Sequence, residues 1–146
     1  MSVGRICQRE VDLADLDESV QAAAERMHQH TAGVLVILND AKQPIGIVTD
    51  RDLVIRVVAG GKDPYTTLVG HVMTPEPKTV SEDTPIESAL SLMRSGGFRR
   101  LPVVDHDGQL VGLVTLDDIL ILLAEEFADV GKLLERETPR AAAEVL

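Results

Sequence analysis

A short pattern occurs twice in the chain and combines residue types that can bind a phosphorylated ligand. An aliphatic segment is followed by Thr, two further residues and Asp, in Ile47-Val-Thr-Asp-Arg-Asp52 and in Leu113-Val-Thr-Leu-Asp-Asp118. Where a strand ends at a helix N-terminus, free N–H groups face an anion, the Thr hydroxyl adds a donor, and the Asp carboxylate accepts from ribose hydroxyls. The candidate ligand contacts are therefore Thr49, Asp52, Thr115 and Asp118.

The same pattern has a purely structural interpretation. Thr-x-x-Asp is also typical of a helix N-cap with an acidic residue in the first turn, which stabilises a helix by about 1 kcal/mol. Taken singly, each copy favours the cap. A cap and a nucleotide site are compatible, since both use the same strand-to-helix geometry.

A local positive patch lies near the second copy. From Ser88 to Val104 there are three arginines, Arg94, Arg99 and Arg100, and no acidic residue. In a chain of net charge −10, such a patch is what an anionic ligand requires. Alternation along a strand predicts that at most one of two neighbouring arginines points into a given cleft. Arg51, between two aspartates, is either a further phosphate contact or a solvated residue.

The remaining polar residues show no pattern typical of catalysis. There is no Ser-His-Asp order with a nucleophile elbow, no GxxxxGK[ST] loop, no paired carboxylates with a cleft of their own and no metal-ligand spacing among the four histidines. Cys7 is the only cysteine, so it forms no intramolecular disulfide, and we interpret it as a small apolar filler. We expect no enzyme activity, no metal and no required cofactor.

Composition excludes two classes of partner. The chain has 146 residues, with 14 Lys and Arg against 24 Asp and Glu, and its only aromatic residues are Tyr65, Phe98 and Phe127. A nucleic-acid surface needs basic stripes and aromatic platforms, so we expect no nucleic-acid partner. No apolar run approaches the about 20 residues of a membrane span, and the charged N-terminus does not resemble a signal peptide. We therefore expect no membrane partner and a cytoplasmic location.

The two copies of the pattern belong to an internal repeat. A shift of 66 residues, without a gap, gives ten identities over positions 17–55, where chance gives about two. The identical pairs are Asp17/Asp83, Ala23/Ala89, Met27/Met93, Leu35/Leu101, Gln43/Gln109, Gly46/Gly112, Val48/Val114, Thr49/Thr115, Asp52/Asp118 and Ile55/Ile121. The chain is therefore built from two copies of one unit.

Each unit is predicted to contain a helix, a hairpin and a second helix. Apolar residues at i, i+3, i+4 and i+7 begin at Val20 and again at Ile86, which predicts two amphipathic helices. Thr84, Pro85 and Glu87 predict a capped start for the second of these, with Thr84 as the cap, Pro85 at the first helical position and Glu87 completing a capping box. Aliphatic runs separated by polar turns predict the hairpins at 34–48 and 101–114. The final helices are expected at 50–58, ended by the glycines at 60 and 61, and from 116 through 134, ended by Thr138-Pro139.

Together these motifs resemble the tandem CBS (cystathionine β-synthase) domain pair, from about Ile6 to Glu126. The residues that carry the resemblance are Gly97-Phe-Arg-Arg-Leu-Pro-Val-Val-Asp105, Gly108-Gln-Leu-Val-Gly-Leu-Val-Thr-Leu-Asp-Asp118, Pro44-Ile-Gly-Ile-Val-Thr-Asp-Arg-Asp52 and Val72-Met-Thr-Pro75. The resemblance implies an α/β (α+β) fold of two repeats related by a pseudo-twofold axis, each a small β-sheet packed with two helices. We expect repeat 1 at 1–62, a linker at 63–78, repeat 2 at 79–128 and a C-terminal helix extension and tail at 129–146.

The resemblance also implies a ligand and its contacts. Family members bind AMP, ADP, ATP or S-adenosylmethionine in clefts between the repeats. Carried over to this chain, Asp52 and Asp118 hold ribose hydroxyls, Thr49 and Thr115 contact phosphate or ribose, and Arg99 and Arg100 reach phosphates. The implied adenine wall comprises Val80, Phe98, Pro102 and Val114 in the second unit and Val34, Val36 and Val48 in the first. The first unit lacks the arginines and the proline, so we expect unequal clefts.

The resulting hypothesis is a non-catalytic sensor that binds an adenosine-containing ligand, with magnesium if that ligand is ATP. It is expected to form a homodimer through apolar helix faces at 53–58 and 119–123. The alternative is a protein–protein docking module whose clefts are vestigial and whose partner binds the acidic helix at 125–137.

Overall fold

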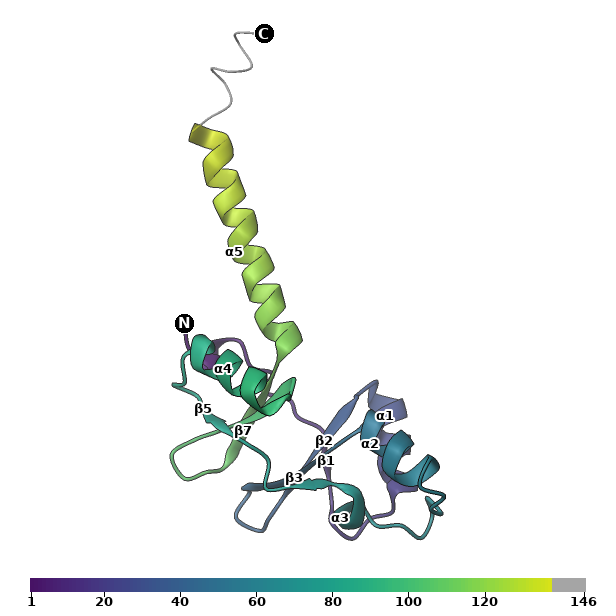
Figure 1. Cartoon of the computed structure of the whole chain (residues 1–146). Coiled ribbons are helices and arrows are strands. Elements are labelled where there is room, and N and C mark those ends of the chain that lie inside the picture. Colours follow the sequence, from purple (N-terminus) through teal and green to yellow (C-terminus); the bar gives the residue numbers. More distant parts are fainter. Residues whose placement is uncertain (138–146) are drawn as a thin grey trace.

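Each repeat folds into a small sheet with helices beside it, as the computed structural model of the chain shows for the described residues, 1–137 (Figure 1). The first sheet has the order β1-β2-β3-β4 and the second has the order β5-β6-β7. Within each sheet a short parallel strand precedes an antiparallel hairpin, so the predicted fold class and both hairpins are confirmed. The strands are β1 (Leu13–Ala14), β2 (Val34–Leu38), β3 (Pro44–Thr49), β4 (Thr74–Pro75), β5 (Val80–Ser81), β6 (Arg100–Val104) and β7 (Leu110–Thr115).

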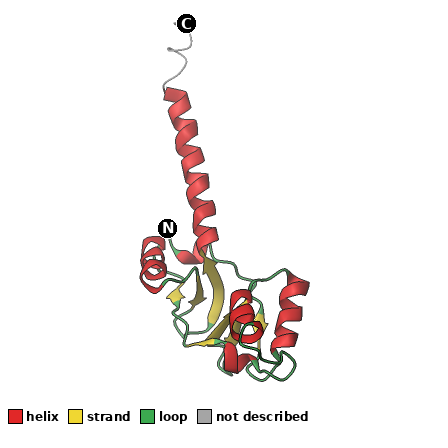
Figure 2. Ribbon diagram, turned by 45° about the vertical axis from the view of Figure 1, so that its right-hand side comes forward, coloured by secondary structure: helices red, strands yellow, loops and turns green. Residues whose placement is uncertain are grey.

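The helices from Val20 and Ile86 and the final helix of each unit lie where the sequence predicts them, whereas η1 and α3 were not predicted and α3 lies in the expected linker (Figure 2). In the second unit the final helix is long, and its predicted end at Thr138-Pro139 lies outside the described residues. In the first unit the equivalent helix begins as α-helix and continues as π-helix. The helices are η1 (Val3–Arg5), α1 (Val20–His30), α2 (Asp50–Asp52), η2 (Leu53–Val58), α3 (Val69–Val72), α4 (Ile86–Gly96) and α5 (Leu116–Glu137).

The strand register repeats with the same 66-residue shift as the sequence. Val34 pairs with Thr49 in the first hairpin, and Arg100 pairs with Thr115 in the second. Each Thr of the repeated pattern therefore ends a strand beside the first residue of the neighbouring strand. That neighbour is the aliphatic Val34 in the first unit and the cationic Arg100 in the second. The two turns therefore have the same geometry but a different charge beside the threonine.

Each unit has its own hydrophobic core. The first is built on α1 and the β2–β3 hairpin, and the second on α4 and the β6–β7 hairpin. Val3 from the N-terminal segment lies in the second core, whereas Val69 and Val72 lie in the first. The buried members are Ala14, Val20, Ala23, Met27, Leu35, Ile37, Val48, Val57, Val69 and Val72 in the first core, and Val3, Val80, Ile86, Ala89, Met93, Leu101, Val103, Val114 and Ile119 in the second.

The two units therefore exchange short segments. The backbone N–H of Val3 donates to the Thr84 carbonyl at 2.8 Å, and Gln8 and Leu113 exchange two backbone hydrogen bonds of 2.9 Å. In return, Val20 N–H donates to the Thr67 carbonyl at 2.9 Å, and β4 pairs with β3. Because each core contains a segment that precedes the other unit in the chain, separating the units would expose buried valines.

This exchange explains why the predicted capping box on α4 is wrong. The helix begins at Ile86 and Pro85 is its N-cap, with an extended backbone at φ −62° and ψ 146°. The Thr84 hydroxyl accepts instead from the Ser81 N–H at 3.0 Å. The Ile86 N–H donates to the carbonyl of Met1 at 3.1 Å, so the exchanged N-terminal segment takes a role that the local sequence assigned to Thr84.

Cys7 packs partly buried against the second core, which agrees with its interpretation as a small filler. Its thiol lies 3.8 Å from the Gly4 carbonyl. Burial raises the pKa of this thiol above its ordinary value. The thiolate, which is the reactive form, is correspondingly disfavoured.

The N-terminal exchange depends on a glycine in β7. A Cβ at Gly112 would lie 2.8 Å from the Cys7 sulfur and 2.8 Å from the Gln8 carbonyl oxygen. We predict that Gly112→Ala lowers the free energy of unfolding by about 1–3 kcal/mol because backbone must move to admit the methyl group. Urea unfolding measures this change.

Gly131 supplies the matched control for that substitution. It lies inside α5, and apart from the backbone of its own helix turn a Cβ there would meet no described heavy atom within 4 Å. Gly131→Ala should therefore raise the free energy of unfolding by about 0.5–1 kcal/mol through helix propensity. Equal effects of the two substitutions would show that the N-terminal segment does not pack tightly on β7.

Candidate ligand-binding site

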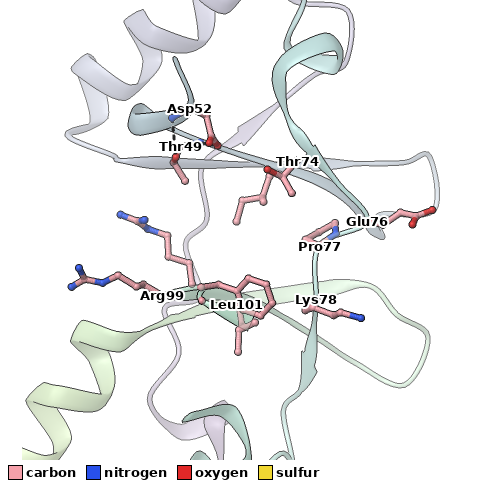
Figure 3. A pocket seen from close by; sticks show the side chains of 12 residues that line it. Thr49, Asp52, Thr74, Glu76, Pro77, Lys78, Arg99 and Leu101 are labelled. Atoms are coloured by element: carbon pink, nitrogen blue, oxygen red, sulfur yellow. Dashed lines mark hydrogen bonds between the residues drawn. The ribbon is translucent and has the colours of Figure 1, made fainter. Parts of the chain in front are cut away.

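A cavity of about 440 Å³, here called the Asp52 cleft, lies between the two units. Figure 3 shows Thr49 and Asp52 on one side of it, Arg99 and Leu101 on the other, and the segment from Glu76 to Lys78 running between them. Both repeats therefore contribute to one site. The lining residues are Ile47, Thr49, Asp52, Thr74, Glu76, Pro77, Lys78, Gly97, Phe98, Arg99, Arg100 and Leu101.

Thr49 and Asp52 form the turn at the polar side of this cleft. The Asp52 N–H donates to the Thr49 hydroxyl at 3.2 Å, and the Thr49 N–H donates to Oδ2 of Asp52 at 2.9 Å. This is a capping box, so the structural interpretation of the pattern is confirmed. The other carboxylate oxygen, Oδ1, lies 3.5 Å from Nη2 of Arg56. A carboxylate offers about four lone-pair sites, which leaves acceptor capacity for hydroxyl groups of a ligand.

The opposite side of the cleft is cationic. Arg99 and Arg100 both line it, which contradicts the expectation that only one would. The reason is that β6 begins at Arg100, so Arg99 lies before the strand and alternation does not apply. The Arg100 side chain reaches the first unit, since a Cβ built on Gly33 would lie 3.5 Å from its Nη2. Arg99 extends toward α5, where its Nη2 lies 3.9 Å from Oδ1 of Asp117.

Among the predicted adenine contacts, the structure places Phe98 in the Asp52 cleft and Val34 in its counterpart described next, whereas Val36, Val48 and Val114 are buried and line neither cleft. Val80 and Pro102 are buried within the second unit, and Arg51 is exposed on α2. None of these three residues lines the Asp52 cleft or its counterpart described next. The apolar side chains that do line the Asp52 cleft are Ile47, Pro77, Phe98 and Leu101.

The repeat generates a second cavity of about 440 Å³, here called the Asp118 cleft. Asp118 and Thr115 form the same reciprocal bonds, at 2.9 and 3.2 Å, and Gln8 donates to Oδ1 of Asp118 at 3.1 Å. The lining residues are Gln8, Glu10, Val11, Asp12, His30, Thr31, Ala32, Gly33, Val34, Leu113, Thr115, Asp117, Asp118 and Ile121.

Charge distinguishes the two clefts. Lys78, Arg99 and Arg100 face two acidic residues in the Asp52 cleft. The lining of the Asp118 cleft includes four acidic side chains and no Lys or Arg, and its one histidine, His30, contacts Asp12 at 2.5 Å. Arg99 and Arg100 lie at the edge of this cleft, where they share a smaller cavity with Thr115 and Asp117. Within residues 1–137, no three His, Cys, Asp or Glu side chains are grouped so that they could hold a metal ion. By charge, the Asp52 cleft is the one suited to an anion.

Sequence reasoning missed the linker residues of the Asp52 cleft, above all Thr74, Glu76 and Lys78. They reach the site because β4 pairs with β3, with Ile47 opposite Thr74. A signal was present, since the 66-residue shift also pairs Glu10 with Glu76. This pairing predicts that the segments around Glu10 and Glu76 occupy equivalent places, and each lines one of the two clefts.

A comparison with protein families decides the identity of the fold. The model of the CBS domain matches residues 3–59 and 69–125. The chain belongs to the CBS-domain family. The resemblance inferred from the motifs is therefore confirmed, and each unit described above is one CBS domain.

Relatives and solved structures support this assignment. The uncharacterized protein MK0525 of Methanopyrus kandleri is 42% identical over 120 residues, which cover 82% of this chain and 61% of that relative. A crystal structure of the CBS domain pair of protein MJ0100 with 5′-methylthioadenosine and S-adenosyl-L-methionine has a TM-score of 0.77 at 26% identity, covering 86% of this chain and 98% of that one. CBSX2 in complex with AMP has a TM-score of 0.73 at 28% identity, covering 85% and 96%. Within the described residues, no helix has the length and apolarity that crossing a membrane requires.

Proposed function

We propose that this chain is a non-catalytic regulatory module that binds an adenosine-containing ligand in the Asp52 cleft. The observation that carries the proposal is the composition of that cleft, which places a carboxylate, an apolar wall and two arginines around one cavity. These groups match ribose hydroxyls, an adenine base and a phosphate, respectively. CBS pairs similar in fold bind AMP, S-adenosyl-L-methionine or 5′-methylthioadenosine, which supports the assignment.

The two clefts should differ in the ligands that they accept. A phosphate in the Asp52 cleft would face Arg99 and Arg100, whereas in the Asp118 cleft it would face Asp117, Asp118 and two further acidic residues. Like charges across a binding surface cost free energy and exclude wrong partners. AMP, ADP or ATP should therefore occupy the Asp52 cleft first, with no cofactor required, and with magnesium only if the ligand is ATP.

Occupancy of this cleft can be passed on as a change in packing. The ligand would contact both CBS domains at once, so it would stabilise the arrangement in which Asp52 and Arg100 face one cavity. A partner that binds that arrangement better than the ligand-free one would respond to the ligand. In this sense the proposed module is a sensor, because its affinity for a partner would report whether the ligand is bound.

The module is also proposed to form a homodimer. Val54, Ile55 and Val58 on η2 are 50–74% exposed, and Leu120 and Ile121 at the base of α5 are 51% and 59% exposed. Exposed apolar side chains of this kind, on one helix of each unit, indicate an interface. We predict that sedimentation at micromolar concentration gives the mass of a dimer or a larger assembly, and that Ile55→Glu lowers this mass by breaking the contact at η2. A monomeric mass for the unaltered protein would contradict this prediction.

A ligand screen tests the proposed function. The purified protein is first examined by mass spectrometry for a co-purified ligand, and its thermal unfolding is then compared with AMP, ADP, ATP, S-adenosylmethionine, NAD and GTP. A ligand at 100 times its dissociation constant should stabilise the fold by about 2.7 kcal/mol. A selective shift with adenosine ligands supports the proposal. No shift with any of them would overturn it in favour of a docking module with vestigial clefts.

A further inference from the structure

The outer part of α5 stands clear of both CBS domains (Figures 1 and 2). The helix has 22 residues, and the second CBS-domain match ends at 125, so about half of it extends beyond the family's fold. Its large apolar side chains are nevertheless solvent-exposed, with Leu123 at 41%, Val130 at 53% and Phe127 at 73%. A projecting helix with such side chains has an apolar face that requires a partner.

The spacing of these side chains indicates what kind of partner fits. Apolar residues at 116, 120, 123, 127, 130 and 134 are separated alternately by four and three residues. This is the 3.5-residue period of a coiled coil, in which one seam of apolar side chains packs against the seam of another helix. The partner of α5 should therefore be a helix with the same period.

The charges of α5 select a second copy in antiparallel orientation. Residues 117–129 carry five acidic residues and no Lys or Arg, whereas residues 130–137 carry Lys132 and Arg136 with two acidic residues. A parallel pair would place the two acidic halves side by side. An antiparallel pair places each acidic half beside the half that holds both cations, which lowers the repulsion.

We propose that α5 of one chain pairs antiparallel with α5 of a second copy through this seam. The register follows from the spacing, because Phe127 then lies opposite Val130 of the partner and Leu123 lies opposite Leu134. Both contacts repeat about one twofold axis, as an interface between identical copies requires. Pairing from 123 to 134 spans about 18 Å and leaves the CBS domains at opposite ends, so it is separate from the homodimer surface proposed above.

Disulfide trapping tests the contact and its orientation. In a Cys7→Ala background, the variants F127C and V130C are prepared separately and oxidised alone or as an equimolar mixture. The antiparallel register brings position 127 of one chain beside position 130 of the other. We expect a covalent dimer to form several-fold faster in the mixture than in either single variant.

Two other results would overturn the proposal. Self-coupling of F127C alone, at the rate of the mixture, would show a parallel pair. A mixture of F127C and A128C serves as the control. If the F127C and V130C mixture couples no faster than this control, the seam is not an interface. AMP binding is measured on the same samples, so a failure of the helix contact is distinguished from a failure of the proposed ligand site.

Discussion

Asp52→Ala should weaken AMP binding by about 10–150-fold, the effect of losing about 1.5–3 kcal/mol from hydrogen bonds to a charged group. The carboxylate is the ribose acceptor that we propose for the cationic cleft. Titration calorimetry measures the dissociation constant directly. Asp118→Ala should change it less than about threefold, since that carboxylate lines the acidic cleft.

The repeat makes these two substitutions a matched pair. Each aspartate accepts from the N–H of its threonine at 2.9 Å, and its own N–H donates to that threonine's hydroxyl at 3.2 Å. Both variants therefore lose the same reciprocal cap bonds. They differ in the proposed ligand contact and in one further partner, Arg56 for Asp52 at 3.5 Å and Gln8 for Asp118 at 3.1 Å. Equal weakening by both, or no weakening by either, would contradict the assignment of ribose to Asp52.

The second large effect is expected from Arg100→Gln. This substitution removes a cation that faces the cleft but keeps a hydrogen-bonding side chain of similar length. Affinity for AMP should fall by about 10–150-fold, whereas affinity for adenosine, which has no phosphate, should be unchanged. Calorimetry with the two ligands isolates the phosphate contact.

Arg94→Gln provides the control for that experiment. Arg94 lies on α4, is exposed and does not line the Asp52 cleft. It carries the same charge on the same unit, so it reports the general effect of one lost cation on an anionic ligand. If Arg100→Gln lowers the affinities for AMP and adenosine equally, Arg100 maintains the shape of the cleft and does not contact the phosphate.

The elements whose signals are local could be predicted from the sequence. The apolar spacing from Val20 and Ile86 located α1 and α4, and the polar turns located both hairpins. Thr49 and Asp52 were predicted either to cap a helix or to bind a ligand, and the structure shows the cap while leaving the carboxylate in a cavity. Each of these features depends on residues within a few positions of one another.

Features that depend on distant segments could not be predicted in the same way. The N–H of Ile86 finds its acceptor on Met1, so no local rule identifies the start of α4 correctly. Lys78 reaches the Asp52 cleft because β4 pairs with the other repeat. Val80 and Pro102 have the apolar character of an adenine wall, but strand alternation cannot tell which apolar side chains face the core and which face a cleft.

A crystal structure of the protein grown with AMP tests the central claim most directly. We predict ligand density in the Asp52 cleft, with the ribose hydroxyls within hydrogen-bond distance of Asp52 and the phosphate beside Arg99 or Arg100. The Asp118 cleft should hold no phosphate. Density for AMP in the Asp118 cleft alone, or in neither cleft at saturating concentration, would contradict the proposed site.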